Sequence, residues 1–363
     1  MEENDGRRDV GGGPKGVKTV PPTEGEKKEA PPASLLTLSS SPHINSGESI
    51  PAIMTQVIVA LIPGLLVGVY YFGMDALQVI VVTTASAIGF EALCQRIMKR
   101  PVTLSDMSAG VTGVILAMNM PSGAPWWLCV VGSGVAIVVG KQLFGGLGYN
   151  PFNPAMVARV VLLISWPVQM TTWPVPQPFF QRTVDTVTGA TPLGKMQESL
   201  LLQGDLSGIA DISLMDQLLG RVGGSLGEIS ALALVAGGLY LMARRIITWH
   251  TPVSYIGSVV VIASIFHLID PNRYASPLFH LVSGSLMMGA FFIATDYVSS
   301  PVTRRGMLIF GTGCGVITMM IRYWGGYPEG VSFAILLMNA ATPLIDRWVK
   351  PRTFGTVPAA VHK

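Results

Sequence analysis

The chain has 363 residues, of which 50% are hydrophobic and only 12% are charged, and its formal net charge is +3. Together with a mean hydropathy of +0.51, this composition argues against an ordinary soluble domain and indicates an integral membrane protein. The three cysteines are isolated, without CxxC or Cys/His spacing, so no metal site is predicted; a cluster shared with a partner protein is the alternative. No nucleic-acid partner is expected.

Residues 1–45 differ from the rest of the chain, because they are rich in Gly, Pro, Glu, Lys and Ser and contain few large apolar side chains. Such a segment buries too little surface to offset its ordering entropy, so we expect a disordered cytoplasmic tail. It lacks the apolar region and cleavage site of a secretory signal. The first span should therefore direct membrane insertion itself.

Apolar segments of span length recur along the remaining chain and predict an all-α integral membrane fold of about ten transmembrane helices. The candidates lie near 51–72, 76–97, 104–120, 124–144, 153–170, 228–246, 252–270, 277–297, 306–322 and 328–346. They form two sets of five, at 46–170 and 228–348, separated by a long connection at 171–227 and followed by a tail at 349–363.

The positions of Lys and Arg predict the orientation. If ten spans alternate, most basic residues fall on one side: Arg7, Arg8, Lys15, Lys18, Lys27, Lys28, Arg96, Lys99, Arg100, Lys141, Arg244, Arg245, Arg304, Arg305, Arg347, Lys350, Arg352 and Lys363. We therefore expect both termini in the cytoplasm. The connection 171–227 then faces the periplasm or the cell exterior.

Polar residues inside spans are functional candidates, because a charge stranded in lipid is costly unless it faces a cavity or a partner. Glu91 in the second span and Asp296 in the eighth are candidates for an ion pathway. The alternatives are an ion pair with an arginine such as Arg96, or an interfacial carboxylate. The asparagine–proline pairs at Asn150 and Asn153 interrupt helix, and such backbone must be buried in protein or line a wet cavity. This turn could coordinate a cation, hold a flavin or be purely structural.

The sequence DTVTGATP, residues 185–192, is a short polar stretch within the long connection. Judged by residue chemistry alone it is a turn, because Gly189 permits a positive φ and Pro192 stops a preceding helix. No histidine lies nearby to activate a threonine as a nucleophile. The residues alone therefore indicate no more than a turn.

Two regions of the chain resemble each other and indicate an internal repeat. SAGVTGVILAMNMPSGAPWW, followed by LFGGLGYNPFNPAMVA, is similar to SGSLMMGAFFIATDYVSSPVTRRG, followed by YWGGYPEGVSFAILLMNA. With five spans in each half, the halves must be inverted in the membrane, an arrangement that places binding sites at interrupted helices. The third and eighth spans would be interrupted, with Asn119 and Asp296 in similar positions. The alternative is that glycine-rich helices look alike because small residues permit close packing.

The polar stretch also resembles a known modification motif. Asp185-x-x-Thr188-Gly189-Ala190-Thr191 is similar to the flavinylation motif Asp-x-x-Ser/Thr-Gly-Ala-Thr, on which a flavin transferase esterifies the last threonine with FMN taken from FAD. The resemblance implies that Thr191 carries covalent FMN through a phosphodiester. It further implies that Gly189 and Ala190 leave room for the transferase and the flavin ring, and that Asp185 belongs to the recognition sequence.

Further stretches identify the family that this motif belongs to. SPHINS at 41–46, LGYNPFNPAMVARV at 147–160 and FFIATDYVSSP at 291–301 resemble the RnfD family, which belongs to the Rnf ion-translocating electron transport complex. The chain is also similar to NqrB of the sodium-pumping NADH:quinone reductase. Tyr297 stands where the family pattern has proline, which puts the shape of that turn in doubt.

The resemblance implies a function that the chain would not perform alone. The complex passes electrons between ferredoxin and NAD while Na+ or H+ crosses the bacterial inner membrane, and this chain would relay electrons through its FMN. The implied partners are RnfG, which carries FMN on the periplasmic side, the membrane proteins RnfA and RnfE, and the flavin transferase. A second flavin, noncovalent riboflavin, is implied within the helical core, without assigned contacts.

Two other classes of protein fit the bare sequence. A channel-like or secondary transporter protein for a small solute, without a redox cofactor, would have the same repeat and broken helices. A purely structural membrane protein would have the same threonine without its modification. Covalently bound flavin separates the first interpretation from both.

Overall fold

The computed structural model describes residues 49–177 and 188–350, and within these ranges the chain forms helices joined by loops, without a β-strand. The predictions for the N-terminal tail 1–45, for nearly all of the C-terminal tail 349–363 and for Asp185 of the polar motif lie outside these ranges. They stay predictions.

Four helices in the described ranges are long and apolar enough to cross a membrane: Ile50–Ile97, Trp126–Phe144, His250–Ile269 and Arg304–Trp324. Shorter apolar helices span Ser108–Met118, Pro154–Ser165 and Ala231–Ala243. The prediction of a helical, multi-pass membrane protein is therefore confirmed at this level. The arrangement of about ten transmembrane helices in two inverted repeats stays a prediction.

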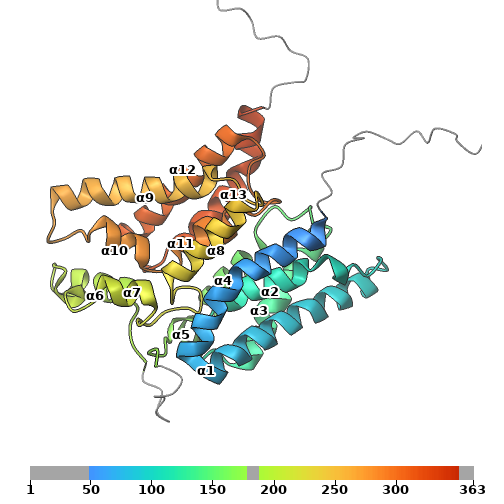
Figure 1. The fold of residues 1–363 in the computed structure, drawn as a ribbon, viewed down its shortest axis with the longest axis horizontal. Helices are drawn as coiled ribbons and strands as arrows, with labels where there is room; N and C mark the ends of the chain where they lie inside the picture. The colour runs from blue at the N-terminus through green and yellow to red at the C-terminus, as the bar shows by residue number, and fades with distance from the viewer. Residues whose placement is uncertain (1–48, 178–187, 351–363) are drawn as a thin grey trace, which may run out of the picture. The chain divides into compact units, whose positions relative to one another are not determined.

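Helix α1 (Ile50–Ile97) contains the first two predicted spans in one continuous element. Its helical backbone is broken at Gly73, where φ is 60° and ψ is −136°. This conformation is readily adopted only by glycine, because any side chain would be strained there. The chain turns back on itself at this point, and the two parts of α1 run beside each other in Figure 1.

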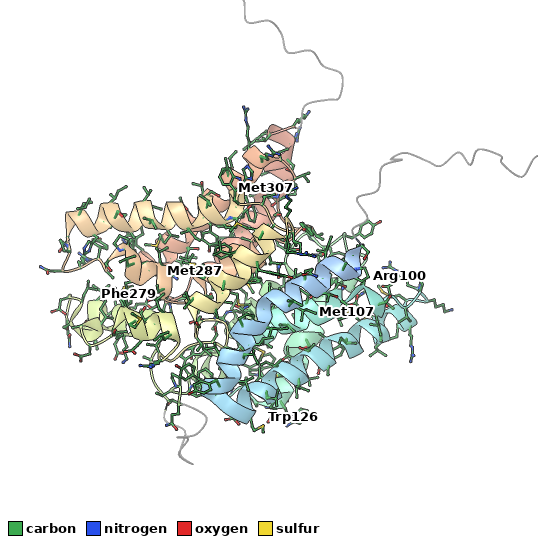
Figure 2. All side chains as sticks on the ribbon, viewed as in Figure 1. Arg100, Met107, Trp126, Phe279, Met287 and Met307 are labelled. Carbon is green, nitrogen blue, oxygen red and sulfur yellow. The ribbon has the colours of Figure 1, made fainter. Side chains whose placement is uncertain are left out.

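The rest of the first half surrounds a short buried helix, α2 (Ser108–Met118). Helix α3 (Trp126–Gly134) continues into a π-helical segment, Val135–Val139, and α4 (Pro154–Ser165) leads to the short α5 (Pro167–Thr171). Gly113 lets α2 approach α1 closely, since a Cβ there would lie 2.7 Å from the Thr84 Cα. Figure 2 labels Arg100 and Met107 at one end of these helices and Trp126 at the other.

The second half is also built from helices. Helix α8 (Ala231–Ala243) precedes α9 (His250–Ile269), and α12 (Arg304–Trp324) and α13 (Val331–Trp348) end the described chain. Helix α9 packs along α12, where Gly311 and Gly315 face Ser254 and Ser258 with no room for a side chain. Such close packing of small residues is typical of membrane helices.

The predicted eighth span is divided into two pieces. Helix α10 (Pro277–Val282) ends at a break formed by Ser283, Gly284 and Ser285, and the chain continues through α11 (Leu286–Met288) into a π-helical segment, Gly289–Ile293. Gly284 has a positive φ of 73°. The third predicted span, 104–120, forms only the short helix α2, which begins at Ser108 and ends at Met118 with Asn119 as its C-cap.

The long connection between the halves is folded where the structure describes it. It contains α6 (Pro192–Leu202) and α7 (Leu214–Leu219). Helix α6 packs on α10 through a small hydrophobic cluster of Leu193, Met196, Ala275 and Phe279. The polar motif therefore leads into a helix that rests on the second half of the protein, near Phe279 in Figure 2.

The end of α2 meets the segment that precedes α8. The carbonyl oxygens of Met118 and Met120 accept hydrogen bonds from the amides of Gly227 and Leu226. The Asn119 Nδ2 atom lies 3.7 Å from the sulfur of Met288 in α11. The carbonyl groups at the end of α2 are thus satisfied by the last residues of the connection before α8, as burial in a membrane protein requires.

Candidate functional site

Thr191 occupies the N-cap position of α6. Its Oγ1 accepts a hydrogen bond of 3.1 Å from the Gly194 amide, and Pro192 fills the first helical position, where its missing N–H costs nothing. The residues before it are also held in place. The Gly189 amide donates to the Trp173 carbonyl at 2.9 Å, and Thr188 pairs with Pro174. The described part of the motif is therefore an ordered turn that ends in a capped helix.

A cavity of about 280 Å³ lies beside this threonine, and we call it the Thr191 cavity. It is lined by Arg159, Leu163, Met170, Thr171, Trp173, Ala190, Thr191, Gly194, Glu228, Tyr327, Pro328 and Glu329. Two aromatic rings, several apolar side chains and a small group of charged residues thus share one space. This composition is common in pockets that bind small organic ligands.

The charged residues of this cavity form a buried cluster. Arg159 of α4 places its Nη2 atom 2.9 Å from Glu329 Oε2 and 3.9 Å from Glu228 Oε1. Only 5% of Arg159 and 7% of Glu228 is exposed. Glu228 Oε1 also accepts a 2.6 Å hydrogen bond from the Ser225 hydroxyl. Charges this deeply buried are retained only when they are paired, and here one arginine lies close to two carboxylates.

The same cluster supports the break between α10 and α11. Glu329 accepts hydrogen bonds from the Ser285 amide and, at 3.0 Å, from the Ser285 hydroxyl. Arg322 donates to the carbonyls of His280 and Ser283 at 2.7 and 2.9 Å. Backbone groups exposed by the break are therefore satisfied by charged side chains from α12 and from the segment before α13.

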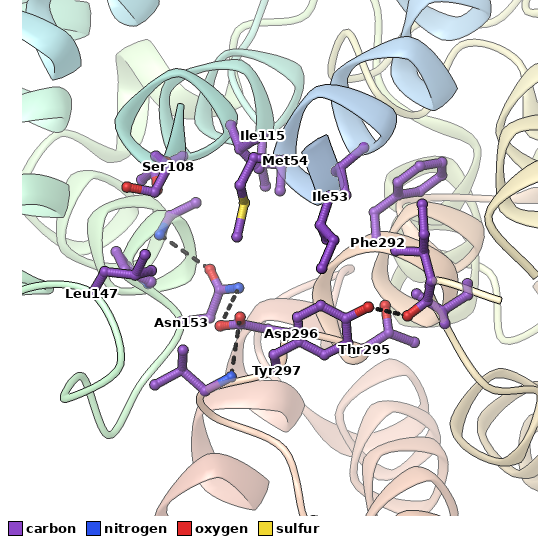
Figure 3. Close-up of a pocket in the computed structure, with 18 of the residues that line it drawn as sticks. Ile53, Met54, Ser108, Ile115, Leu147, Asn153, Phe292, Thr295, Asp296 and Tyr297 are labelled. Carbon is purple, nitrogen blue, oxygen red and sulfur yellow. Dashed lines mark hydrogen bonds between the residues drawn. The ribbon is translucent and has the colours of Figure 1, made fainter. Parts of the chain in front are cut away.

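A second cavity, the Asp296 cavity, lies where α1, α2, α4 and the segment after Ile293 meet, and its volume is about 90 Å³. Asp296 Oδ2 accepts hydrogen bonds from Ser299 Oγ at 2.9 Å and from Asn153 Nδ2 at 3.4 Å. Figure 3 shows Asn153 and Asp296 side by side at the edge of this space, opposite Met54 and Ile115. The structure thus brings together two of the predicted candidates from different halves of the chain.

The asparagines of the interrupted turn also have local roles. Asn153 caps α4, with its Oδ1 accepting from the amides of Ala155 and Met156, and Asn150 donates to the Phe152 carbonyl. Both asparagines line the Asp296 cavity. Each of these asparagines therefore stabilises the turn and also lines the cavity.

Glu91 is paired with a lysine from another element, whereas the sequence suggested a nearby arginine such as Arg96. Lys141 Nζ lies 2.7 and 2.8 Å from the two Glu91 carboxylate oxygens and 2.6 Å from Ser108 Oγ. Both side chains are buried, with 1% of Glu91 and 2% of Lys141 exposed. Lys141 was counted among the cytoplasmic charges, but it points inward and lines the Asp296 cavity.

Tyr297, the residue that departs from the family pattern, lies at a turn after the second π-helical segment. Its hydroxyl donates to the Ile246 carbonyl in the connection between α8 and α9. The turn is therefore tied to the α8–α9 connection by the side chain that the departure introduces, as the dashed line in Figure 3 shows.

Sequence reasoning did not identify the charged cluster at the Thr191 cavity. Arg159 lies within the stretch 147–160, where it served only for the family resemblance, and Glu228 and Glu329 stand at the first residues of predicted spans, where interfacial charges are ordinary. The signal that could have found them is an arginine in the middle of an apolar segment, since such a residue needs buried partners. No group of three metal-ligating side chains was found in the described ranges.

The sequence is similar to known proteins over most of its length. Residues 37–355 match the NQR2, RnfD, RnfE family. The D subunit of the Na(+)-translocating ferredoxin:NAD(+) oxidoreductase complex of Acetobacterium woodii is 49% identical over 320 residues, covering 88% of this chain and 95% of that protein. The D subunit of the proton-translocating ferredoxin:NAD(+) oxidoreductase complex of Clostridium ljungdahlii is 43% identical over 325 residues, covering 89% and 97%. The D subunit of an ion-translocating oxidoreductase complex of Stutzerimonas stutzeri is 46% identical over 327 residues, covering 85% and 92%.

Proposed function

The chain belongs to the NQR2, RnfD, RnfE family, and from this premise we propose that it is the RnfD component of an ion-translocating ferredoxin:NAD(+) oxidoreductase complex. In this proposal it relays electrons through FMN bound covalently at Thr191 and helps to couple their transfer to the movement of Na+ or H+. The proposal is supported by relatives that are 43–49% identical and are named as subunits of such complexes. Those relatives carry names for both cations, so the names favour neither.

The geometry around Thr191 supports a covalent flavin. A phosphodiester on Thr191 Oγ1 would place negative charge at the N-terminus of α6, where backbone amides and the helix dipole favour an anion. The adjoining cavity of about 280 Å³ is close to the lower end of the usual size range of ligand pockets, and Trp173 and Tyr327 line it. The residues present therefore fit a phosphate-linked planar ring.

Attachment of the flavin requires a simple exchange of bonds. The threonine oxygen forms a bond to the FMN phosphorus of FAD, the pyrophosphate bond breaks, AMP leaves, and the hydroxyl proton is lost to solvent. Bound FMN supplies the capacity to accept and pass on electrons. The chain's own residues hold the ring at a fixed place, exclude water through Leu163 and Met170, and set the local charge through the arginine–glutamate cluster.

The Asp296 cavity is the part of the described structure that suits an ion pathway. Its volume of about 90 Å³ accommodates a cation with a few waters, and Asp296 presents its carboxylate there, with Asn153 Nδ2 donating to Oδ2. Glu91 contributes through its partner Lys141. The noncovalent riboflavin implied for the helical core stays a prediction, and we derive no step through it.

The topology of the proposal follows from the basic residues and the repeat. Ten spans in two inverted halves would put both termini in the cytoplasm and α6 on the periplasmic side of the bacterial inner membrane. In the two similar stretches the start of α2 at Ser108 corresponds to the break after α10 at Ser283, which supports the repeat. The Thr191 cavity would then face RnfG in the periplasm, with the membrane proteins RnfA and RnfE beside the helices and the flavin transferase acting before assembly.

The observation that best supports the proposal is that Thr191 caps α6 at the edge of a cavity. Attachment of flavin to this threonine can be tested directly. We expect the chain, co-expressed with a flavin transferase, to show flavin fluorescence that survives denaturing electrophoresis. Thr191→Asn should lose this fluorescence while α6 stays capped, because asparagine is a good N-cap but has no hydroxyl to esterify. Thr186→Ala, at a variable position of the motif, should keep it. Fluorescence that persists in Thr191→Asn would exclude Thr191 as the attachment site.

A further inference from the structure

Arg159 presents an unused donor to the Thr191 cavity. Its Nη2 atom is engaged by Glu329 at 2.9 Å, but its Nη1 atom has no hydrogen-bond partner among the residues that the structure describes. The residue is only 5% exposed, and it lines the same cavity as Thr191. A buried cationic donor without a partner is costly, so such a group in a cavity wall indicates an anionic or acceptor ligand.

The carboxylates of the cluster are held by other groups as well. Glu329 Oε1 accepts from Ser285, so only its Oε2 atom serves Arg159. Glu228 lies farther away, at 3.9 Å, and is bonded to Ser225. Neither carboxylate accepts a hydrogen bond from the Nη1 atom of Arg159. Arg159 is thus oriented by Glu329 through Nη2, while its Nη1 donor has no partner among the described residues.

We propose that Arg159 is the positioning residue that supplies positive charge to the isoalloxazine ring of the flavin carried on Thr191, with Glu329 holding the guanidinium in place. This inference rests on the proposed function. Each electron that reaches the ring adds one negative charge unless a proton accompanies it. A guanidinium in the wall of the cavity stabilises that charge, whereas the Glu329 carboxylate opposes it. The balance between Arg159 and Glu329 would therefore set the potential of this flavin.

The proposal predicts shifts of opposite sign for two substitutions. Arg159→Gln removes the positive charge and should lower the midpoint potential of the Thr191 flavin. Glu329→Gln removes a negative charge and should raise it. Arg159→Lys keeps the charge and should restore most of the loss. A tenfold change in the equilibrium constant of a one-electron step corresponds to about 59 mV, and we expect at least this change for Arg159→Gln.

The measurement uses the assembled complex in membranes. Spectroelectrochemical titrations are recorded for the native complex and each variant, and the spectrum of a Thr191→Asn complex is subtracted to isolate the flavin in question. Denaturing electrophoresis of the same samples shows whether that flavin is attached.

The possible outcomes separate the two proposals. Absence of attached flavin in the native chain would overturn the proposed function itself. Attached flavin with equal potentials, or with shifts of the same sign in Arg159→Gln and Glu329→Gln, would overturn the role of Arg159 alone. If Arg159→Gln does not assemble, the upward shift in Glu329→Gln or its absence decides the question.

Discussion

At the scale of single residues, the two cavities are distinguished by how their charges are paired. Around Thr191 one arginine lies close to two carboxylates and keeps an unused donor, which leaves the cluster able to interact with a ligand. Around Glu91 the pairing is complete, because Lys141 uses all three of its donors on Glu91 and Ser108. We therefore expect Glu91 and Lys141 to contribute strongly to stability, whatever part they have in ion movement.

Substitutions in the Glu91–Lys141 pair test this expectation. Lys141→Met should destabilise the protein by about 3–5 kcal/mol, because it leaves a buried carboxylate without its partner. The double variant Glu91→Gln with Lys141→Met should lose less than the sum of the two single variants. Thermal unfolding of the purified protein in detergent gives the comparison as a double-mutant cycle.

The exposed pair of Arg221 and Asp216, at 3.5 Å, provides the matched control. Asp216→Asn should leave the unfolding temperature nearly unchanged, because solvent screens that pair. Equal changes of unfolding temperature in Lys141→Met and Asp216→Asn would show that the Glu91–Lys141 pair contributes no more to stability than an exposed pair does.

At the scale of elements, the interrupted helices explain how charged side chains enter the interior. The break between α10 and α11 exposes backbone carbonyls and an amide, and Arg322 and Glu329 satisfy them. Glu329 then reaches across to Arg159 of α4, so the break, the cluster and the Thr191 cavity form one connected network. A substitution that distorts the break should therefore also change the geometry of the Thr191 cavity.

Gly284 is the position at which this connection is most sensitive. It has a φ of 73°, and a Cβ there would lie 2.4 Å from Glu329 Oε1 and 2.8 Å from Leu193 Cδ1. Gly284→Ala should cost more than about 1 kcal/mol through backbone strain alone, and it should also displace Glu329. Thermal unfolding and, in the complex, the amount of attached flavin measure the two effects.

Gly257 in α9 is the control for this substitution, because nothing lies within 4 Å of a Cβ placed there. Gly257→Ala should be neutral or stabilise the protein by up to about 1 kcal/mol, as expected for a helix position with open space around it. If Gly284→Ala behaved like Gly257→Ala, the break would not have the rigid geometry described above.

The sequence predicted more of the elements than of the contacts between them. Apolar runs located most helices, and the internal repeat predicted that the third and eighth spans are interrupted. The partners could not be predicted in the same way. Arg159 and Glu329 are 170 residues apart, and nothing in either local sequence specifies the other. For the same reason, the only ion-pair partner that the sequence suggested for Glu91 was a nearby arginine such as Arg96, whereas its partner Lys141 is 50 residues away.

At the scale of the whole molecule, the proposed function depends on which face of the membrane carries α6. The basic residues predict that the segment 188–227 and both termini lie on opposite sides. Ala210 is exposed in this segment, and Lys350 is exposed after α13. These two positions can report the orientation.

Cysteine labelling tests the predicted orientation. In a variant with the three native cysteines replaced by alanine, Ala210→Cys should react with a membrane-impermeant thiol reagent added to intact spheroplasts. Lys350→Cys should react only after the membrane is permeabilised. Labelling of both positions in intact spheroplasts would contradict an odd number of spans between them, and the reverse pattern would invert the orientation.

The central claim is that Thr191 carries FMN, and the most direct measurement is the mass of the tryptic peptide 183–195 from the assembled complex. We predict a mass increase equal to FMN less one water, which fragmentation assigns to Thr191 and which is absent from Thr191→Asn. An unmodified peptide, from cells whose transferase modifies a control substrate, would contradict the claim. An increment assigned to Thr186 or Thr188 would contradict it as well, because the hydroxyl that caps α6 beside the cavity is that of Thr191.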